Sequence, residues 1–237
     1  MRSKKEVIKL SRFEIVTIEE LLKRLEKYSY RQLHIHHTWK PDHSNFNGKN
    51  HIQLQEGMYI YHTKTNKWQD IAQHVTLMPD GTFVTGRNFS KDPVSIQGWN
   101  TGAFAVEMLG NFDIGCDKLE GKQKESLIKL ARYFAERFGP ESIKFHNEGP
   151  GVKKTCPGSL LDKKEFMKEV LAMGKVFKDV EDGRWSAKYI EAAKNLDLIS
   201  GNTDGTFHPT SPLTREQAAV LMVRLYEKIT GRKVVEE

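Results

Sequence analysis

Apolar side chains recur at helical spacing in several stretches of the first part of the chain. In residues 17–28 they follow Thr17 and Glu20, whose spacing is that of a capping box at a helix start. The same periodicity predicts a longer helix over residues 119–138 and another over residues 160–173. These segments are amphipathic, so we expect helices that pack one face against a core.

Alternation of apolar and polar residues predicts a strand over residues 32–38. Apolar side chains occupy one set of alternate positions, and histidines occupy the other. Because successive side chains of a strand point to opposite faces, His34 and His36 should share one face. His37 should then face the other side.

Further strands are predicted by shorter patterns. Residues 74–87 read as two short strands around a turn at Gly81, where glycine supplies a positive φ. Residues 104–109 are almost entirely apolar, which is typical of a strand covered on both faces, but Glu107 interrupts them. A short strand over residues 143–146 completes the set. Strands mixed with helices predict an α/β fold, with a mixed central sheet flanked by helices.

The pattern changes near residue 174. An amphipathic helix over residues 187–196 is followed by a glycine-rich loop. A second helix should begin after Thr214, a residue type that caps helices, with the acidic Glu216 in its first turn. These features predict a small, mainly α module. We therefore divide the chain into domains of residues 1–173 and 174–237.

Composition narrows the classes of partner. The chain has 237 residues, of which 38% are hydrophobic, and this is enough to build a packed core. Its net charge of +6 favours an anionic partner, but no tract interleaves basic with stacking aromatic residues, which argues against nucleic acid. No stretch approaches the ~20 apolar residues of a transmembrane helix. The N-terminus lacks the apolar run of a signal peptide, so we expect synthesis in the cytoplasm without one.

Two segments far apart in the chain carry side chains that bind metals. One comprises His36, His37 and Thr38, and the other runs from His146 to Cys156. Imidazole nitrogen and thiolate sulfur suit Zn²⁺, and three protein ligands leave a fourth position open for water. The pattern predicts a catalytic zinc site, in which the ion lowers the pKa of water towards ~7.

Hydrolysis of an amide also needs a proton carrier and a group that stabilises an oxyanion. Glu107, a carboxylate within an apolar strand, is the leading candidate for the proton carrier. Lys154, two residues before Cys156, can face the developing negative charge. The alternatives are that Glu107 pairs with a cation in the core and that Lys154 is an ordinary surface lysine.

The metal-binding segments belong to a longer ordered set, which comprises residues 35–38, 74–87, 105–112, 146 and 154–158. This set resembles the zinc-dependent N-acetylmuramoyl-L-alanine amidases, the superfamily of peptidoglycan-recognition proteins and phage lysozyme-like amidases. The resemblance implies the amidase fold of peptidoglycan-recognition proteins. It also implies that His36, His146 and Cys156 hold Zn²⁺. It also implies peptidoglycan as substrate, cleaved at the amide between the lactyl group of N-acetylmuramic acid and L-alanine.

The sequence departs from this family at Gln73, where many members carry a tyrosine that assists catalysis. Glutamine cannot act as an acid or base at neutral pH. A branch of the family that cleaves soluble anhydromuropeptides uses a glutamate on the strand corresponding to residues 105–110. Because Glu107 falls on that position, the resemblance implies that Glu107 is the base.

The C-terminal module resembles one surface-layer homology repeat over residues 176–231, on a pattern formed by Phe177, Asp179, Trp185, Gly201, Asp204, Gly205, Phe207, Pro209, Leu213, Thr214, Arg215 and Glu216. The resemblance implies binding to anionic secondary cell-wall polysaccharide, through Trp185, Thr214, Arg215 and Glu216. Arginine at a helix N-terminus suits a carboxylate or a phosphate. Since the family usually binds through three repeats, self-association would restore the missing surfaces.

Other side chains are expected to contact the substrate, namely His74, Arg87, Trp99 and Asn100. For His74, a hydrogen bond within the sheet is an equal alternative. Trp39 and Trp68 can line a groove for sugar and peptide, although aromatic side chains more often belong to a core.

The sequence thus predicts a lytic peptidoglycan amidase that acts at the bacterial cell wall after release, as a phage or prophage endolysin or as an autolysin. One alternative is a peptidoglycan-binding protein without catalysis. The presence of all three types of zinc ligand argues against it. Another is a cytosolic amidase that recycles anhydromuropeptides, which leaves the C-terminal module without a role.

Overall fold

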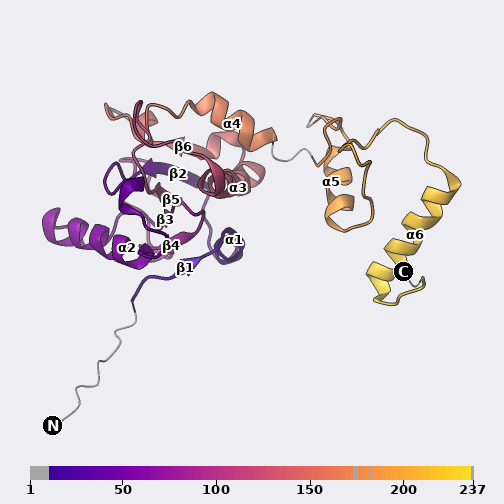
Figure 1. Ribbon diagram of the computed structural model, residues 1–237, viewed down its shortest axis with the longest axis horizontal. Helices are drawn as coiled ribbons and strands as arrows, with labels where there is room; N and C mark the ends of the chain where they lie inside the picture. The colour runs from indigo at the N-terminus through magenta and orange to yellow at the C-terminus, as the bar shows by residue number, and fades with distance from the viewer. Residues whose placement is uncertain (1–10, 173–175, 182, 236–237) are drawn as a thin grey trace, which may run out of the picture. The chain divides into compact units, whose positions relative to one another are not determined.

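The computed structural model describes residues 11–172, 176–181 and 183–235. The chain forms two compact units, of which the first ends at Val170 and the second begins at Leu171 (Figure 1). The predicted domain boundary at residues 173 and 174 lies outside the described residues, as do residues 1–10, which entered the signal-peptide expectation.

A six-stranded mixed sheet forms the centre of the first unit, in the order β1-β4-β3-β5-β2-β6. Its strands are β1 (Ile15–Val16), β2 (Gln32–His37), β3 (Val75–Leu77), β4 (Phe83–Thr85), β5 (Ala103–Met108) and β6 (Ile143–Phe145). Strand β2 runs parallel to β5 and β6, and β3 runs parallel to β5, whereas β4 is antiparallel to β3 and β1. The predicted mixed sheet is confirmed, and the carboxyl ends of β2, β3 and β5 meet at one edge.

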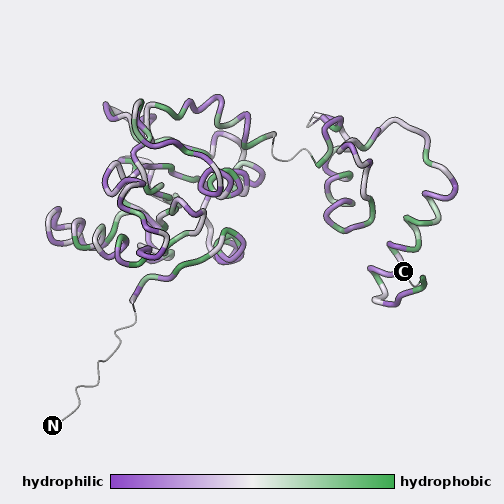
Figure 2. Tube along the Cα trace, viewed as in Figure 1, coloured by the Kyte–Doolittle hydropathy of each residue, from purple (hydrophilic) through white to green (hydrophobic). Residues whose placement is uncertain are grey.

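Three helices cover one face of this sheet, namely α1 (Ile18–Leu25), α3 (Gly121–Phe138) and α4 (Lys163–Ala172) (Figure 1). Hydrophobic and hydrophilic residues alternate along them (Figure 2), and the hydrophobic ones enter a single core with every second residue of the strands. The capping box predicted for α1 is present, since Glu20 N donates to Thr17 Oγ1 and Thr17 N donates to Glu20 Oε2. Amphipathic periodicity therefore located these helices correctly.

The opposite face carries a helix that the periodicity did not predict. Helix α2 (His51–Ile60) continues into a π-helical turn, η2 (Tyr61–Thr65). The buried positions of α2 are His51, Gln55 and Met58, at the spacing of one helix face. Because two of these three side chains are polar, the buried stripe does not stand out as a hydrophobic pattern.

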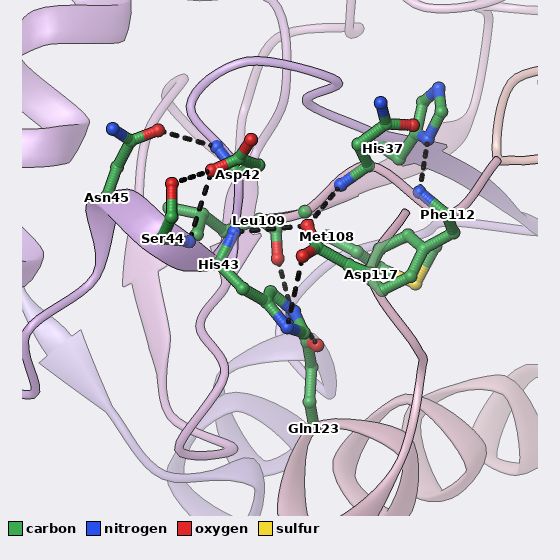
Figure 3. A network of polar contacts seen from close by, with 12 residues as sticks. His37, Asp42, His43, Ser44, Asn45, Met108, Leu109, Phe112, Asp117 and Gln123 are labelled. Atoms are coloured by element: carbon green, nitrogen blue, oxygen red, sulfur yellow. Dashed lines mark hydrogen bonds and ion pairs between the residues drawn. The ribbon is translucent and has the colours of Figure 1, made fainter. Parts of the chain in front are cut away.

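The loop that follows β2 is tied to helix α3 by a polar network (Figure 3). Its 3₁₀ turn η1 (His43–Asn45) donates from His43 N to Asp117 Oδ2 over 3.1 Å. The His43 ring lies 2.9 Å from Gln123 Oε1, while Gln123 Nε2 donates to the carbonyl oxygens of Leu77 and Leu109. One glutamine of α3 thus joins the ends of β3 and β5 to the loop after β2. Two more 3₁₀ turns flank β6, η3 (Pro140–Ser142) and η4 (His146–Glu148).

The second unit contains α5 (Ala187–Asn195), α6 (Arg215–Thr230) and a small core. Phe177, Val180 and Ile190 are buried together. Gly201 lies against this core with φ 70°, and a Cβ there would clash with the ring of Phe177. Glycine is therefore required both by the backbone and by the packing.

Helix α6 begins at the predicted cap, since Gln217 N donates to Thr214 Oγ1 over 3.1 Å. Within the described part of the chain, no residue of α6 is buried. Apolar side chains such as Met222 and Ile229 are 65% and 75% exposed, so α6 presents apolar surface. No helix within the described residues has the length and the hydropathy that crossing a lipid bilayer requires.

Candidate metal centre and its cavity

Three polar side chains stand abreast on the sheet face opposite α1, α3 and α4. His36 of β2 pairs in register with Glu107 of β5, and Glu107 pairs in register with Thr76 of β3. Residues paired in register point to the same side of a sheet. Their neighbour Ile35 lies in the core behind the sheet, as the alternation along β2 predicts. We call His36, Glu107 and Thr76 the polar row.

His36 lies at one end of this row, beside two residues that arrive from the other end of the chain. Ligand atoms of His36, His146 and Cys156 all lie within 4.8 Å of one another. The rings of His36 and His146 are 4.5 Å apart, and Cys156 Sγ is 3.7 Å from His36 Nδ1. The fold thus brings together residues that are up to 120 positions apart in the sequence.

Backbone hydrogen bonds hold these side chains in place. His146 opens the turn η4 directly after β6, and Asn147 N donates to Cys156 O over 2.8 Å. The backbone N–H of His37 donates to Cys156 Sγ over 3.4 Å, and the His37 ring accepts from Phe112 N (Figure 3). His37 therefore positions the sulfur through its backbone.

Burial prepares the two imidazoles to bind a cation. It lowers the pKa of His36 well below its ordinary value, and nearby positive groups, among them His146 and Lys154, add to the effect. Burial also lowers the pKa of His146, with Lys154 again contributing. Both rings are therefore neutral at pH 7 and present lone pairs. His36 Nε2 has no hydrogen-bond partner among the described residues.

The sulfur behaves differently. Burial raises the pKa of Cys156 to about 12, so in these surroundings the group is a thiol at neutral pH. The His37 N–H and Lys154 already favour the thiolate, and a cation bound at the sulfur would favour it further. Two neutral imidazoles and one sulfur that needs a cation form a donor set suited to Zn²⁺. The residues present fit that ion.

A cavity of about 640 Å³ opens on this cluster. It is lined by His36, His146 and Cys156 and also by Glu107 and Lys154, so the structure brings the predicted ligands and both predicted catalytic residues together. Burial raises the pKa of Glu107 to about 8, which places its titration near neutral pH. A carboxyl group with such a pKa can take up and release a proton under ordinary conditions.

Two tryptophans stand at the rim of the cavity. Trp39 is 58% exposed and has a φ of 58°, while its N–H donates to Gly110 O over 3.0 Å. A bulky residue at positive φ costs about 1–3 kcal/mol, so the surrounding structure must hold it there. Trp68 is 41% exposed, and its ring lies 4.9 Å from that of His62. Both indoles line the cavity, as one interpretation of the sequence proposed.

His74 does not line this cavity, although the sequence made it a candidate for substrate contact. Its Nε2 lies 2.8 Å from Lys91 O, and its Nδ1 accepts from Ala105 N over 3.1 Å. The ring stacks on Phe104 with centroids 4.9 Å apart. Strand β3 begins only at Val75, so His74 escapes the strand alternation and turns into the core. The position of His74 therefore agrees with the alternative interpretation, in which its ring forms hydrogen bonds within the fold.

Three other predicted substrate contacts also lie outside the lining of this cavity. Arg87 donates to the backbone carbonyls of Ile71 and Asp92. Asn100 accepts three hydrogen bonds from Ser95 and Ile96, which closes a turn. The ammonium of Lys144 lies 5.2 Å from the ring centre of Trp99. In the structure these side chains organise loops.

The predicted wall-binding residues belong to the second unit. Trp185 is 81% exposed, with Tyr189 as an aromatic neighbour at 6.4 Å. Thr214 caps α6, and Arg215 and Glu216 form its first turn, all three exposed. Exposure leaves them available to a ligand.

Some residues that line the cavity were not predicted to do so. His62 comes from the π-helical turn after the unpredicted α2, and Ser95 and Asp113 come from loops without a periodic pattern. Gln73, which the sequence marked only by its inability to act as an acid or base, also lines the cavity. A contact between loops has no counterpart in local sequence, so only the structure could place these residues.

Comparison with known families gives two matches. The family model described as N-acetylmuramoyl-L-alanine amidase matches residues 26–159. The model described as S-layer homology domain matches residues 176–219.

Solved structures with a similar fold include an amidase, a phage endolysin and an insect protein. The N-acetylmuramoyl-L-alanine amidase LysC from Clostridium intestinale is 24% identical, with 60% of this chain and 86% of that chain covered and a TM-score of 0.48. The Ph2119 endolysin of a Thermus scotoductus bacteriophage is 18% identical, with coverages of 60% and 84% and a TM-score of 0.47. Drosophila PGRP-LB is 16% identical, with coverages of 67% and 86% and a TM-score of 0.47.

The curated relatives are much longer than the matched segments. The outer membrane protein SlpA of Thermus thermophilus is 43% identical over 63 residues, which are 25% of this chain and 7% of that protein. An endoglucanase of a Bacillus species is 43% identical over 51 residues, which are 22% of this chain and 5% of that protein. The chain therefore spans less than a tenth of the length of these relatives.

Replacing the sulfur ligand should abolish tight zinc binding. In Cys156→Ser the hydroxyl cannot supply a thiolate, so we expect zinc affinity to fall by at least about 10²-fold. Cys116 is exposed and is not one of the three clustered ligands, which makes Cys116→Ser the matched control. Competition with a chromophoric chelator measures both affinities. Unchanged zinc affinity in Cys156→Ser would refute the assignment.

Removing the carboxyl of Glu107 should change the pH dependence of stability in the zinc-free protein. Burial raises the folded-state pKa from 4.5 to about 8, so the stability that this proton provides is complete below about pH 4.5 and is lost as pH rises through about 8. Glu107→Gln should therefore unfold at similar urea concentrations to wild type near pH 4.5. At pH 9 it should be more stable by about 1–3 kcal/mol, allowing for solvent in the cavity. A stability difference that is the same at both pH values would contradict the buried position of this carboxyl.

Proposed function

This chain belongs to the N-acetylmuramoyl-L-alanine amidase family through residues 26–159, and we propose that it hydrolyses the amide between the lactyl group of N-acetylmuramic acid and L-alanine in peptidoglycan. One observation carries the proposal. A single cavity collects the nitrogen and sulfur donors of a zinc site, a carboxyl group that titrates near neutral pH, and a lysine. These are the groups that hydrolysis of an unactivated amide requires.

His36, His146 and Cys156 would hold the zinc ion, two as neutral imidazoles and one as a thiolate. When bound, the ion supplies Lewis acidity, which makes water more acidic and polarises a carbonyl group. Its positive charge would also offset the cost of a buried thiolate. The three residues thus fix where the carbonyl carbon must lie to be attacked.

Glu107 would carry the proton. Its carboxylate would accept a proton from the attacking water and then deliver it to the nitrogen that leaves with L-alanine. Its pKa of about 8 applies to the protein without a cation. A cation near by favours the ionised form, so the working pKa would be lower than this and closer to neutral. Register with His36 keeps the carboxyl beside the ligands.

Lys154 would stabilise the negative charge that develops on the carbonyl oxygen. Its charge contributes to the lowered pKa values of both His36 and His146, which reflects its closeness to them. Lys153 lines the same cavity but does not contribute to those pKa shifts. The two neighbouring lysines therefore provide an internal comparison.

The tryptophans at the rim would contact the glycan and the peptide stem. A second cavity of about 540 Å³ adjoins the first and shares Trp39, His62 and Glu107 with it. Met58 and Tyr61 form part of its wall. Two adjoining cavities that share Trp39 and Glu107 suit a substrate that extends beyond the scissile amide.

The second unit would target the enzyme to the wall. The match to the S-layer homology domain supports binding to an anionic cell-wall polysaccharide. Arg215 is the first residue of α6, where backbone N–H groups and the helix dipole also favour an anion. The exposed apolar side chains of α6 support self-association through this unit. Together the two units support action at the bacterial cell wall, as an endolysin or an autolysin.

Substitution of the two catalytic groups should reduce cleavage without removing the ligands. We expect Glu107→Gln to lower kcat by about 10²–10⁴-fold, because amide side chains do not transfer protons. Lys154→Met should lower kcat by about 10²–10³-fold through loss of oxyanion stabilisation, whereas Lys153→Met serves as the matched control and should lose much less. New amino termini of L-alanine, released from purified sacculi, measure the activity of each variant.

Zinc-loaded wild type that releases no such termini would refute the amidase proposal. If that protein still binds sacculi, the alternative of a peptidoglycan-binding protein without catalysis would be favoured instead. Normal activity of Glu107→Gln would show that another group carries the proton.

Wall binding should depend on the charge at the start of α6. Arg215→Ala should reduce the fraction of protein that sediments with purified walls by about 3- to 10-fold, through loss of a charge-assisted hydrogen bond. Arg232→Ala removes the same charge from an exposed position after α6 and is the matched control. Equal sedimentation of both variants would argue against a site at the N-terminus of α6.

A further inference from the structure

A directed chain of hydrogen bonds runs beneath the cavity, from helix α2 to the end of the polar row. Gln55 Nε2 donates to the backbone carbonyl of Thr85 over 3.0 Å, so Gln55 Oε1 faces the other way. The hydroxyl of Thr76 donates to that Oε1 over 2.6 Å, which uses its only proton. The same hydroxyl oxygen accepts from Gln73 Nε2 over 2.9 Å. The Thr76 proton and one N–H of each amide are thereby assigned, which gives the amide of Gln73 one orientation.

The chain ends in an acceptor that lacks a donor. Gln73 Oε1 has no hydrogen-bond partner among the described residues, although Gln73 is only 3% exposed. Buried polar atoms are nearly always hydrogen-bonded, because an unpaired one is destabilising. Gln73 also lines the cavity that holds the candidate metal centre. The residue that bears this buried, unpaired carbonyl oxygen therefore forms part of the wall of the site.

The backbone fixes this arrangement as firmly as the side chains do. Arg87 N donates to Gln73 O over 2.9 Å. Gly86 packs so closely that a Cβ there would lie 2.7 Å from Gln73 O and 2.9 Å from Gln55 Nε2. Glycine at this position allows the backbone of Gln73 and the side chain of Gln55 to approach the same segment.

The position of Gln73 relative to the polar row determines which group it can meet. His36, Glu107 and Thr76 lie abreast in that order, and the amide of Gln73 is bound to Thr76. The candidate ligand His36 therefore lies on one side of Glu107, and Thr76, with the amide of Gln73 bound to it, lies on the other. A substrate amide that is cleaved beside Glu107 must lie between them.

A trans secondary amide points its carbonyl oxygen and its N–H in opposite directions. With the carbonyl oxygen directed at the metal ligands and Lys154, the N–H is directed at Gln73. We propose that Gln73 Oε1 accepts a hydrogen bond from the N–H of the scissile amide. The inference rests on the proposed function and makes it more specific, since it selects secondary amides over esters and N-substituted amides.

The test compares two substrates that differ in one atom. One is N-acetylmuramoyl-L-alanyl-D-isoglutamine, and the other is its ester analogue, in which oxygen replaces the alanine N–H. Gln73→Met removes the acceptor and keeps the side-chain length. It should lower kcat/KM for the amide by about 10- to 100-fold. On the ester it should keep at least the wild-type kcat/KM, because no N–H is there to be held.

A second variant tests the orientation of the amide. Thr76→Val leaves Gln73 in place but removes the hydroxyl that holds its Nε2, so the amide group can rotate. It should cause a smaller loss, again for the amide substrate alone. Gln53→Met, an exposed substitution on α2, is the matched control. Zinc content and urea unfolding, measured for each variant, show that the site and the fold persist.

Two results would overturn the inference while leaving the amidase proposal intact. Equal losses on amide and ester in Gln73→Met would show that the residue only supports the structure. Wild-type kcat/KM for the amide in Gln73→Met would show that there is no contact. A wild-type protein that cleaves neither substrate nor sacculi would overturn the proposed function, and the inference with it.

Discussion

The pairing of β2, β5 and β3 in one register is the constraint on which the site depends. It sets His36, Glu107 and Thr76 abreast on one sheet face, while Ile35, Val106 and Val75 enter the core on the other. A shift of β2 by a single residue would exchange the two sets, turning the candidate ligand His36 away from the cavity and core side chains towards it. Folding of the core and assembly of the site are therefore the same event, because the apolar residues that secure the register also aim the polar ones.

Burial at the candidate site determines the chemistry of His36, Glu107 and Cys156. Removal from water keeps His36 neutral and raises the pKa of Glu107 to about 8 and that of Cys156 to about 12. For the histidine, this favours the form that binds metal. For the cysteine, it favours the form that does not, so binding of a cation must overcome the cost of a buried thiolate. The pKa of the Glu107 carboxyl lies between those of the other two groups, so this group is able to titrate near neutral pH.

Local sequence predicted those parts of the fold in which hydrophobic periodicity and burial coincide. The strands around Gly81, the capped helix α1 and the long helix α3 follow from their patterns. Helix α2 does not, because its buried face is built from His51 and Gln55, which bond within the fold. The clustering of the three candidate metal ligands could be predicted because their residue types are rare and chemically specific. The walls of the cavity could not, since they depend on where loops lie.

Gln55 belongs to a buried polar stripe, and this is why hydrophobic periodicity did not predict helix α2. Gln73 belongs to the same stripe, and there the polar character points to a ligand. A buried polar stripe is stable only when each member has a partner, and in Gln55, Thr76 and Gln73 at least one donor of each has one. The final acceptor, Gln73 Oε1, has no partner among the described residues, and we propose that a ligand supplies one. An amide oxygen accepts hydrogen bonds at any pH, whereas the carboxyl of Glu107 changes between acceptor and donor as it titrates. In the proposed reaction the two residues would therefore divide the work on the leaving nitrogen. A fixed acceptor can hold the N–H in place while the neighbouring carboxyl delivers a proton to the same atom.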